Sequence, residues 1–141
     1  MMLDSSTLPA ALLEVRYDGS RMPGKEPVPD VLHGANCQLF AYAMLQHFGR
    51  PLLTFRSSEL WADTTQTEIV EPPFDALDLL LFNKTSDPWG AHVAVSLGGD
   101  EAIHLSKRVG HPVVWTLDRF KQESDYRVLV GAKRVRPAPN V

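Results

Sequence analysis

The sequence predicts a single α+β domain, and two observations carry this prediction. Apolar residues in the first half recur at helical spacing, most clearly over residues 36–48. After Pro72-Pro73 the pattern changes to short apolar runs that alternate with period two, as in residues 92–97 and 102–106. Helices followed by antiparallel strands are typical of an α+β domain. The 141 residues suit one domain, which we assign to residues 1–141.

The first half is expected to hold a short helix, a long loop and one strong helix. Hydroxyl residues before Leu8-Pro9 mark a helix start, and this helix should end before Tyr17. Residues 18–35 are rich in glycine and proline and predict a loop, which at this length is often functional. Residues 36–48 are apolar nearly all round and predict a buried central helix with Asn36 as its N-cap. One further helical turn is expected at residues 57–61.

The second half predicts a series of strands. They are expected near residues 77–82, 92–97, 102–106, 112–117 and 126–135, with a helical segment at 118–123. Gly98-Gly99 marks the turn of a hairpin. A three-residue loop of Leu97, Gly98 and Gly99 would set Ser96 opposite Asp100.

The same register would set His92 directly opposite His104, whereas a two-residue loop would put the two histidines on opposite faces of the sheet. Directly opposite residues share one face of a sheet, with Cβ atoms about 5 Å apart. Ala94 and Ala102 would lie on the histidine face. Their small side chains would leave room there for the end of the buried helix.

Cys37 is the only cysteine, and it begins the predicted central helix directly after its cap. Unpaired backbone N–H groups and the helix dipole at this place favour a negative charge, so we expect a lowered thiol pKa. The thiolate is the nucleophilic form of cysteine. The same N–H groups can donate to the oxyanion of a tetrahedral intermediate. The alternative is a buried structural thiol, since free cysteine is among the most buried residues.

Composition excludes several classes of function. A net charge of −3 argues against a nucleic-acid binder and gives no reason to expect a membrane partner. No H-x-x-x-H or C-x-x-C spacing supports a metal site, and no cofactor is expected. The N-terminus lacks the features of a secretory signal, so the expected location is cytoplasmic. Delivery outside the cell by a dedicated secretion machine remains open.

Three segments in order resemble the NlpC family of cell-wall cysteine peptidases. They are Asn36-Cys37-Gln38-Leu39-Phe40-Ala41-Tyr42, then Asp78-Leu79-Leu80-Leu81-Phe82, then His92-Val93-Ala94-Val95-Ser96-Leu97-Gly98 leading to Ile103-His104. The likeness spans roughly residues 8–120. It implies a papain-like α+β core in which a central buried helix carries the cysteine and packs on an antiparallel sheet.

The resemblance also implies roles for three residues. Cys37 would be the nucleophile, His92 its base, and His104 the third member that orients the base. Asp100 and His111 remain alternatives for the third position. The implied activity is that of a cysteine peptidase or amidase, typically acting on peptides of bacterial peptidoglycan.

This sequence departs from the family pattern at several positions. The family usually has Asp before its cysteine and Ser or Trp after it, where this chain has Asn36 and Gln38. The glycine that usually precedes the "DL" pair is Leu77. A family tyrosine that lines the site lies closer to the cysteine than Tyr17 does, so residues 18–35 would contain an insertion.

Tyr17 and Trp61 are the candidate substrate-binding residues, and Trp89 is a further aromatic in a predicted loop. The predicted function is hydrolysis of an amide bond in a peptide or muropeptide through Cys37, His92 and His104. A thiol acyltransferase on the same core and a catalytically inactive binding module are the alternatives.

Overall fold

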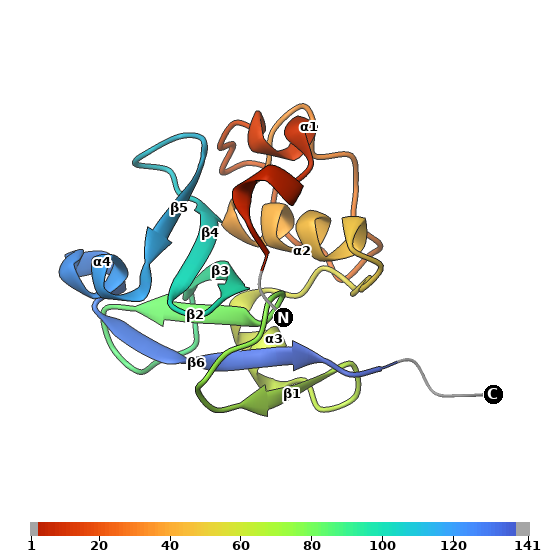
Figure 1. The fold of residues 1–141 in the computed structure, drawn as a ribbon. Coiled ribbons are helices and arrows are strands. Elements are labelled where there is room, and N and C mark those ends of the chain that lie inside the picture. Colours follow the sequence, from red (N-terminus) through yellow and green to blue (C-terminus); the bar gives the residue numbers. More distant parts are fainter. Residues whose placement is uncertain (1–2, 138–141) are drawn as a thin grey trace.

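A six-stranded antiparallel sheet organises the structure, a computed structural model that describes residues 3–137 (Figure 1). The spatial order of the strands is β1-β6-β2-β3-β4-β5. Figure 1 shows β4 and β5 running steeply across the direction of β2 and β6, so the sheet is strongly twisted. The strands are β1 (Thr67–Val70), β2 (Leu79–Asn83), β3 (His92–Gly98), β4 (Glu101–Leu105), β5 (Pro112–Thr116) and β6 (Val128–Val135).

The helices are short except for one. The elements are η1 (Ser5–Thr7), α1 (Ala10–Leu13), α2 (Cys37–His47), α3 (Ser57–Ala62), α4 (Leu117–Gln122) and η2 (Ser124–Tyr126). Helix α2 begins after Asn36, whose side-chain oxygen accepts a hydrogen bond from the Leu39 N–H at 2.9 Å, as the sequence predicts. Among the described residues, no helix has both the length and the apolar character that a membrane crossing requires.

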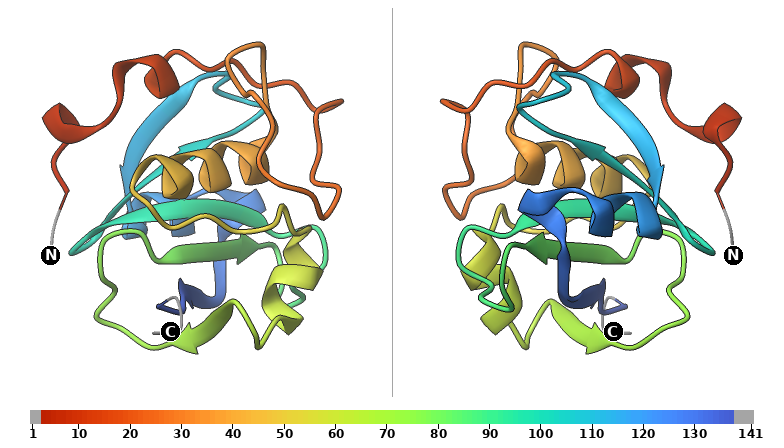
Figure 2. Two further views of the ribbon diagram at one scale, coloured as in Figure 1. Left: turned by 90° about the vertical axis from the view of Figure 1, so that its right-hand side faces the viewer. Right: turned by 90° about the vertical axis from the view of Figure 1, so that its left-hand side faces the viewer.

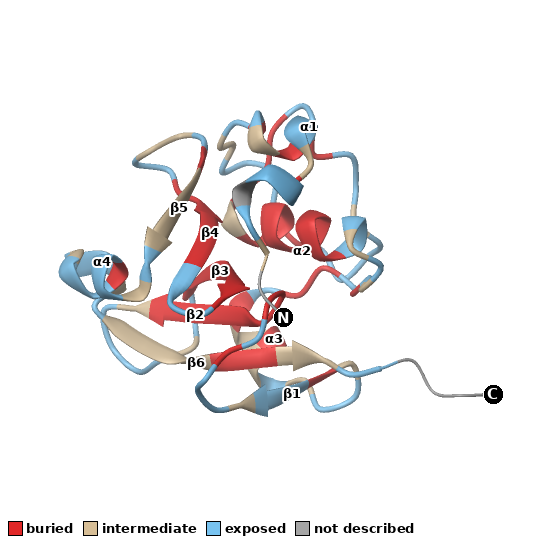
Figure 3. Cartoon of the chain, in the orientation of Figure 1, coloured by how far each residue is buried: buried red, intermediate tan, exposed pale blue. Residues whose placement is uncertain are grey.

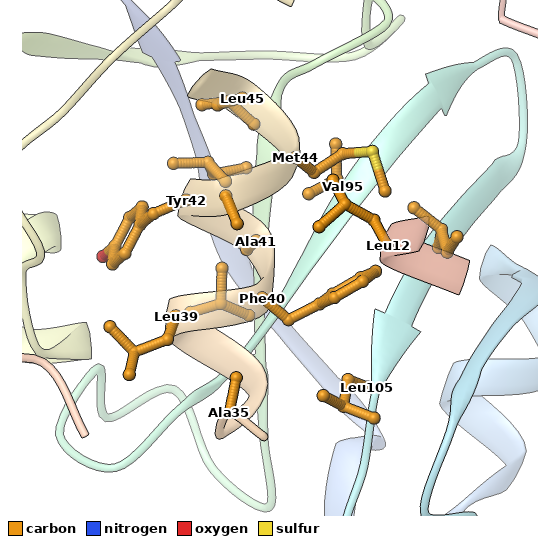
Figure 4. Close-up of a cluster of buried hydrophobic side chains, with 14 of the residues drawn as sticks. Leu12, Ala35, Leu39, Phe40, Ala41, Tyr42, Met44, Leu45, Val95 and Leu105 are labelled. Atoms are coloured by element: carbon orange, nitrogen blue, oxygen red, sulfur yellow. The ribbon is translucent and has the colours of Figure 1, made fainter. Parts of the chain in front are cut away.

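Helix α2 lies over β3 and β4 and is buried nearly all round (Figures 2 and 3). Its apolar side chains join those of α1 and one face of the sheet in the main core, including Leu12, Phe40, Met44, Val95 and Leu105 (Figure 4). The polar tip of its Tyr42 is satisfied because the hydroxyl donates to the Phe55 carbonyl at 2.7 Å. The prediction of a buried central helix on an antiparallel sheet is confirmed.

A second, smaller core covers the opposite face of the sheet. Its residues are Phe74, Leu80, Phe82, Ala94, Ala102, Phe120 and Ala132. Phe120 comes from α4, so α2 and α4 cover different faces. The expectation that α2 approaches over Ala94 and Ala102 is therefore wrong, because Phe120 packs against these small residues instead.

The β3–β4 hairpin has a different register from the predicted one. Ser96 lies opposite Ala102 and Gly98 lies opposite Glu101, so the turn is Gly99-Asp100. The pairing shifts between Ser96 and Gly98, which leaves one extra residue in β3 as a bulge. Gly98 and Gly99 have φ of 89° and 65°, a region that favours glycine.

Because of the bulge, His92 and His104 lie on the same face of the sheet. A two-residue turn without a bulge would have put them on opposite faces. Extending the register from Val95 opposite Ile103 puts His104 opposite Ala94. His92 and His104 are therefore diagonal neighbours on one face, and the predicted direct pairing is wrong. At this diagonal spacing the two imidazole rings can still touch each other.

Two further elements differ from expectation. Strand β1, which pairs with β6 at the edge of the sheet, is absent from the predicted elements because its alternation covers only four residues. The last strand begins at Val128, so Tyr126 lies in the preceding turn. Residues 18–35 form the predicted loop.

Candidate active site

Cys37 is the first residue of α2, and the residue as a whole is half-buried. The backbone N–H groups of Cys37, Gln38 and Val93 interact with the sulfur and lower its pKa. Burial acts in the opposite direction and is the larger effect, so it raises the pKa of the Cys37 thiol to about 11. The expected lowering of this pKa is thus wrong in its net sign, because desolvation of the thiolate outweighs the helix terminus.

His92 opens β3, directly before Val93, and its ring pairs with that of His104 from β4. His92 Nε2 lies 2.8 Å from His104 Nδ1, and the two rings are nearly perpendicular, with centroids 5.0 Å apart. Burial lowers the pKa of His92 to about 3. Burial, followed by the charges of His92 and Arg119, lowers the pKa of His104 to about 2. Both imidazoles are therefore neutral near pH 7.

The other two candidates for the third position have different surroundings. Asp100 is an exposed residue of the β3–β4 turn. Its backbone carbonyl accepts a hydrogen bond from the Leu117 N–H. His111 is exposed, and its Nδ1 lies 3.2 Å from the Pro112 carbonyl. Among residues 3–137, the described hydrogen bonds join His92 to His104 and to neither alternative.

Aromatic side chains enclose the two histidines. The Tyr126 ring stacks on His92 with centroids 4.4 Å apart and an interplanar angle of 20°. The ring centroids of Trp115 and Phe120 lie 4.3 Å and 4.6 Å from the centroid of the His104 ring. His104 Nε2 is buried and has no hydrogen-bond partner among the described residues. The sequence pattern did not identify Tyr126, since a turn residue carries no periodicity and only the tertiary fold brings it to His92.

Tyr17 lies beside the start of α2 although it is 20 positions away in sequence. Tyr17 and Ala35 form an isolated parallel bridge, in which Asp18 N–H donates to the Ala35 carbonyl at 2.9 Å. The loop 18–35 therefore begins and ends at the same place. Burial, and then the nearby Cys37 and Asp18 charges, raise the pKa of Tyr17. The structure thus brings Tyr17 into the electrostatic range of the thiol.

Trp61, the other candidate for substrate binding, packs on the sheet. A Cβ at Gly131 of β6 would overlap the Trp61 ring, so this ring occupies the space that the glycine leaves free. Lys133 Nζ lies 6.0 Å from the ring centroid and donates to the Trp61 carbonyl at 3.2 Å. Trp61 therefore has a clear packing role, and its contact with a substrate stays a prediction.

No metal site accompanies the thiol in the part of the chain that the structure describes, since residues 3–137 hold no group of three or more metal-binding side chains. A cavity of about 650 Å³ lies at the far end of α2, between Gly49–Leu52 and the end of β6. Cys37 is at the opposite end of that helix. The cavity is therefore separate from the thiol and the histidine pair.

Comparison with solved structures places this arrangement in a known fold. An NlpC/P60 family protein from Bacillus cereus ATCC 10987 superimposes on 92% of this chain with a TM-score of 0.62 and 19% identity. The NlpC/p60 domain of the peptidoglycan hydrolase SagA superimposes on 77% of the chain with a TM-score of 0.53 and 26% identity.

The chain has the NlpC/P60 fold. This confirms the predicted papain-like α+β architecture and the resemblance that suggested it. The chain spans 41% of the Bacillus cereus protein and 83% of the SagA domain. The sequence matches no protein-family model, and no curated protein matches it.

Proposed function

We propose that this protein is a cysteine peptidase or amidase that hydrolyses an amide bond in peptidoglycan-derived peptides. Cys37 is the nucleophile, His92 is the general base, and His104 orients His92. The observation that supports this most directly is the 2.8 Å contact between His92 Nε2 and His104 Nδ1, together with the interaction of the N–H of Val93, the residue after His92, with the Cys37 thiol at a helix N-terminus. The NlpC/P60 fold and the peptidoglycan hydrolase among its neighbours support the substrate class.

The proposed role of His92 as general base requires one tautomer of the histidine pair. His92 Nε2 donates to His104 Nδ1, which leaves His92 Nδ1 unprotonated and able to accept the thiol proton. Neutral His104 then carries its proton on Nε2, which is buried without a partner among the described residues. Trp115 and Phe120 lie against that ring, and an aromatic face is a weak acceptor for an N–H group.

The reaction is acyl transfer to sulfur and then to water. His92 Nδ1 takes the thiol proton as Sγ attacks the amide carbonyl, and the backbone N–H groups at the start of α2 donate to the oxyanion. The imidazolium gives this proton to the amine, the C–N bond breaks, and a thioester remains. Water then attacks the thioester while His92 takes a proton from it, and that proton returns to the released thiolate.

The pKa values predict a broad pH profile. The Cys37–His92 pair carries one proton between the two titrations, at about pH 3 and about pH 11, whichever atom holds it. For the folded enzyme, kcat/KM should therefore form a plateau across neutral pH.

Hydrolysis of a defined muropeptide mixture, followed by mass spectrometry, tests the proposal. The wild-type protein should release pairs of fragments whose masses sum to that of the substrate plus one water, and Cys37→Ala should release none while keeping the melting temperature. Fragment release by Cys37→Ala would contradict the role of the thiol. An intact mixture together with tight binding would instead favour the inactive binding module, and products joined to an added amine would favour the acyltransferase.

A further inference from the structure

A buried chain of hydrogen bonds connects the segments that carry Cys37 and His92. Gln38 follows Cys37, and its Nε2 donates to Ser57 Oγ at 2.5 Å. Ser57 is the first residue of α3, and its Oγ donates to the carbonyl of Ala91, the residue before His92. Gln38, Ser57 and Ala91 are all buried, with 9%, 1% and 1% of their surface exposed.

The chain extends back to the residue before the thiol. Asn36 Nδ2 lies 3.4 Å from Gln38 Oε1 and donates to it, while Asn36 Oδ1 caps α2. Residues on both sides of Cys37 and the residue before His92 thus belong to one network. Asn36 and Gln38 are the two positions where this sequence departs from the NlpC pattern around the cysteine.

The chemistry of these side chains suits a one-way chain of donors. An amide has both donor and acceptor groups, so Gln38 can accept from Asn36 and donate to Ser57. A hydroxyl has one proton, which Ser57 gives to Ala91 while its lone pair accepts from Gln38. Buried polar groups that all have partners rigidify their surroundings.

We infer that Ser57 and the Gln38 side chain are positioning residues that hold the start of α2 at a set distance from the start of β3. This inference rests on the proposed function, because it assigns the network to the alignment of Cys37 with His92. The Val93 N–H, which interacts with the thiol, belongs to the segment that Ser57 holds through Ala91. Losing the network should therefore move this N–H and the base away from the sulfur together.

Ser57→Ala and Gln38→Met remove the network without adding a charge near the thiol. Each should lower kcat on a muropeptide by about ten- to a hundred-fold and leave KM within about two-fold, because small misplacements of reacting groups have costs of this size. The double variant should lose little more than either single variant, since both break one chain. Ser57→Thr keeps the hydroxyl and should restore most of kcat.

Matched controls lie on the same helices. Ser58 is the next residue of α3, and Gln46 is exposed at the other end of α2. Ser58→Ala and Gln46→Met should have wild-type kcat. Equal kcat in Ser57→Ala, Gln38→Met and the controls would overturn the inference, as would independent, multiplying losses in the double variant.

Alkylation of Cys37 by iodoacetamide at a fixed pH of about 9 gives a readout that needs no substrate. Both variants should react more slowly than wild type, since the N–H groups that stabilise the thiolate move away. Unchanged or faster alkylation would overturn the inference even if the enzyme hydrolyses muropeptides. Slower alkylation in the variants of a wild-type protein that hydrolyses nothing would support the network while the proposed function fails.

Discussion

The buried histidine pair should make the folded protein sensitive to mild acid. His92 and His104 have 9% and 0% of their surface exposed, and their pKa values are lowered to about 3 and about 2. In the unfolded chain both imidazoles titrate near the ordinary value of 6.5. Below that pH the unfolded state binds protons that the folded state does not, so the free energy of unfolding falls as pH falls.

The size of this effect follows from linkage. Each histidine that is neutral in the folded state and protonated in the unfolded state contributes a slope of about 1.4 kcal/mol per pH unit. For His92 and His104 together the slope approaches about 2.7 kcal/mol per pH unit. The free energy of unfolding should therefore be about 4 kcal/mol lower at pH 5 than at pH 8. This loss is a large share of the free energy of unfolding of a typical domain, which is about 5–15 kcal/mol.

Urea unfolding measured at intervals between pH 5 and pH 8 checks this prediction. His104→Gln removes one titrating group and keeps an acceptor for His92, so it should halve the slope below pH 6. His47→Gln is the control, because His47 is exposed at the end of α2. A wild-type stability that is flat over this range, or a His104→Gln slope equal to that of wild type, would refute the reasoning.

Three further substitutions test an ion pair, the packing of Trp61 and the ring that stacks on His92. Asp78→Ala should lower the free energy of unfolding by about 3 kcal/mol in urea titrations, because its buried carboxylate accepts two bonds from Arg134 at 2.7 and 2.8 Å. Gly131→Ala should lower the melting temperature, since its Cβ would overlap the Trp61 ring, and a smaller side chain at position 61 should reduce that loss. Tyr126→Leu removes the ring stacked on the base and should lower kcat several-fold in the muropeptide assay with the thermal unfolding curve little changed.

Local sequence signals predicted the elements with strong patterns. The central helix was predictable because residues 36–48 combine a cap, continuous apolar character and a glycine stop. The hairpin followed from period-two alternation and Gly98-Gly99. The shared face of His92 and His104 was predicted from a three-residue loop, and it is found in the structure because a bulge accompanies the two-residue turn. The ordered motifs together predicted the NlpC/P60 fold, which the structural neighbours confirm. The roles of the site residues and the cytoplasmic location stay predictions.

The register of the hairpin could not be read from the same signals. The observed pairing of β3 with β4 differs from the predicted one by two positions, because the turn is Gly99-Asp100 and the bulge between Ser96 and Gly98 adds one residue, so each side chain keeps its predicted face. Period-two patterns carry information about faces and none about a shift by two. The face on which α2 packs was also open, since both faces of β3 are buried.

The sequence by itself determined the α+β class and the helix start that carries Cys37, because these depend on contacts between near neighbours in the chain. The common face of the two histidines was predicted from a three-residue loop, and in the structure it depends on the bulge in β3. Only the tertiary structure decided the net pKa of the thiol, the stacking of Tyr126 on His92, and the link from Gln38 through Ser57 to Ala91. Desolvation and hydrogen bonding between distant segments arise when the chain packs, and no local pattern encodes their balance.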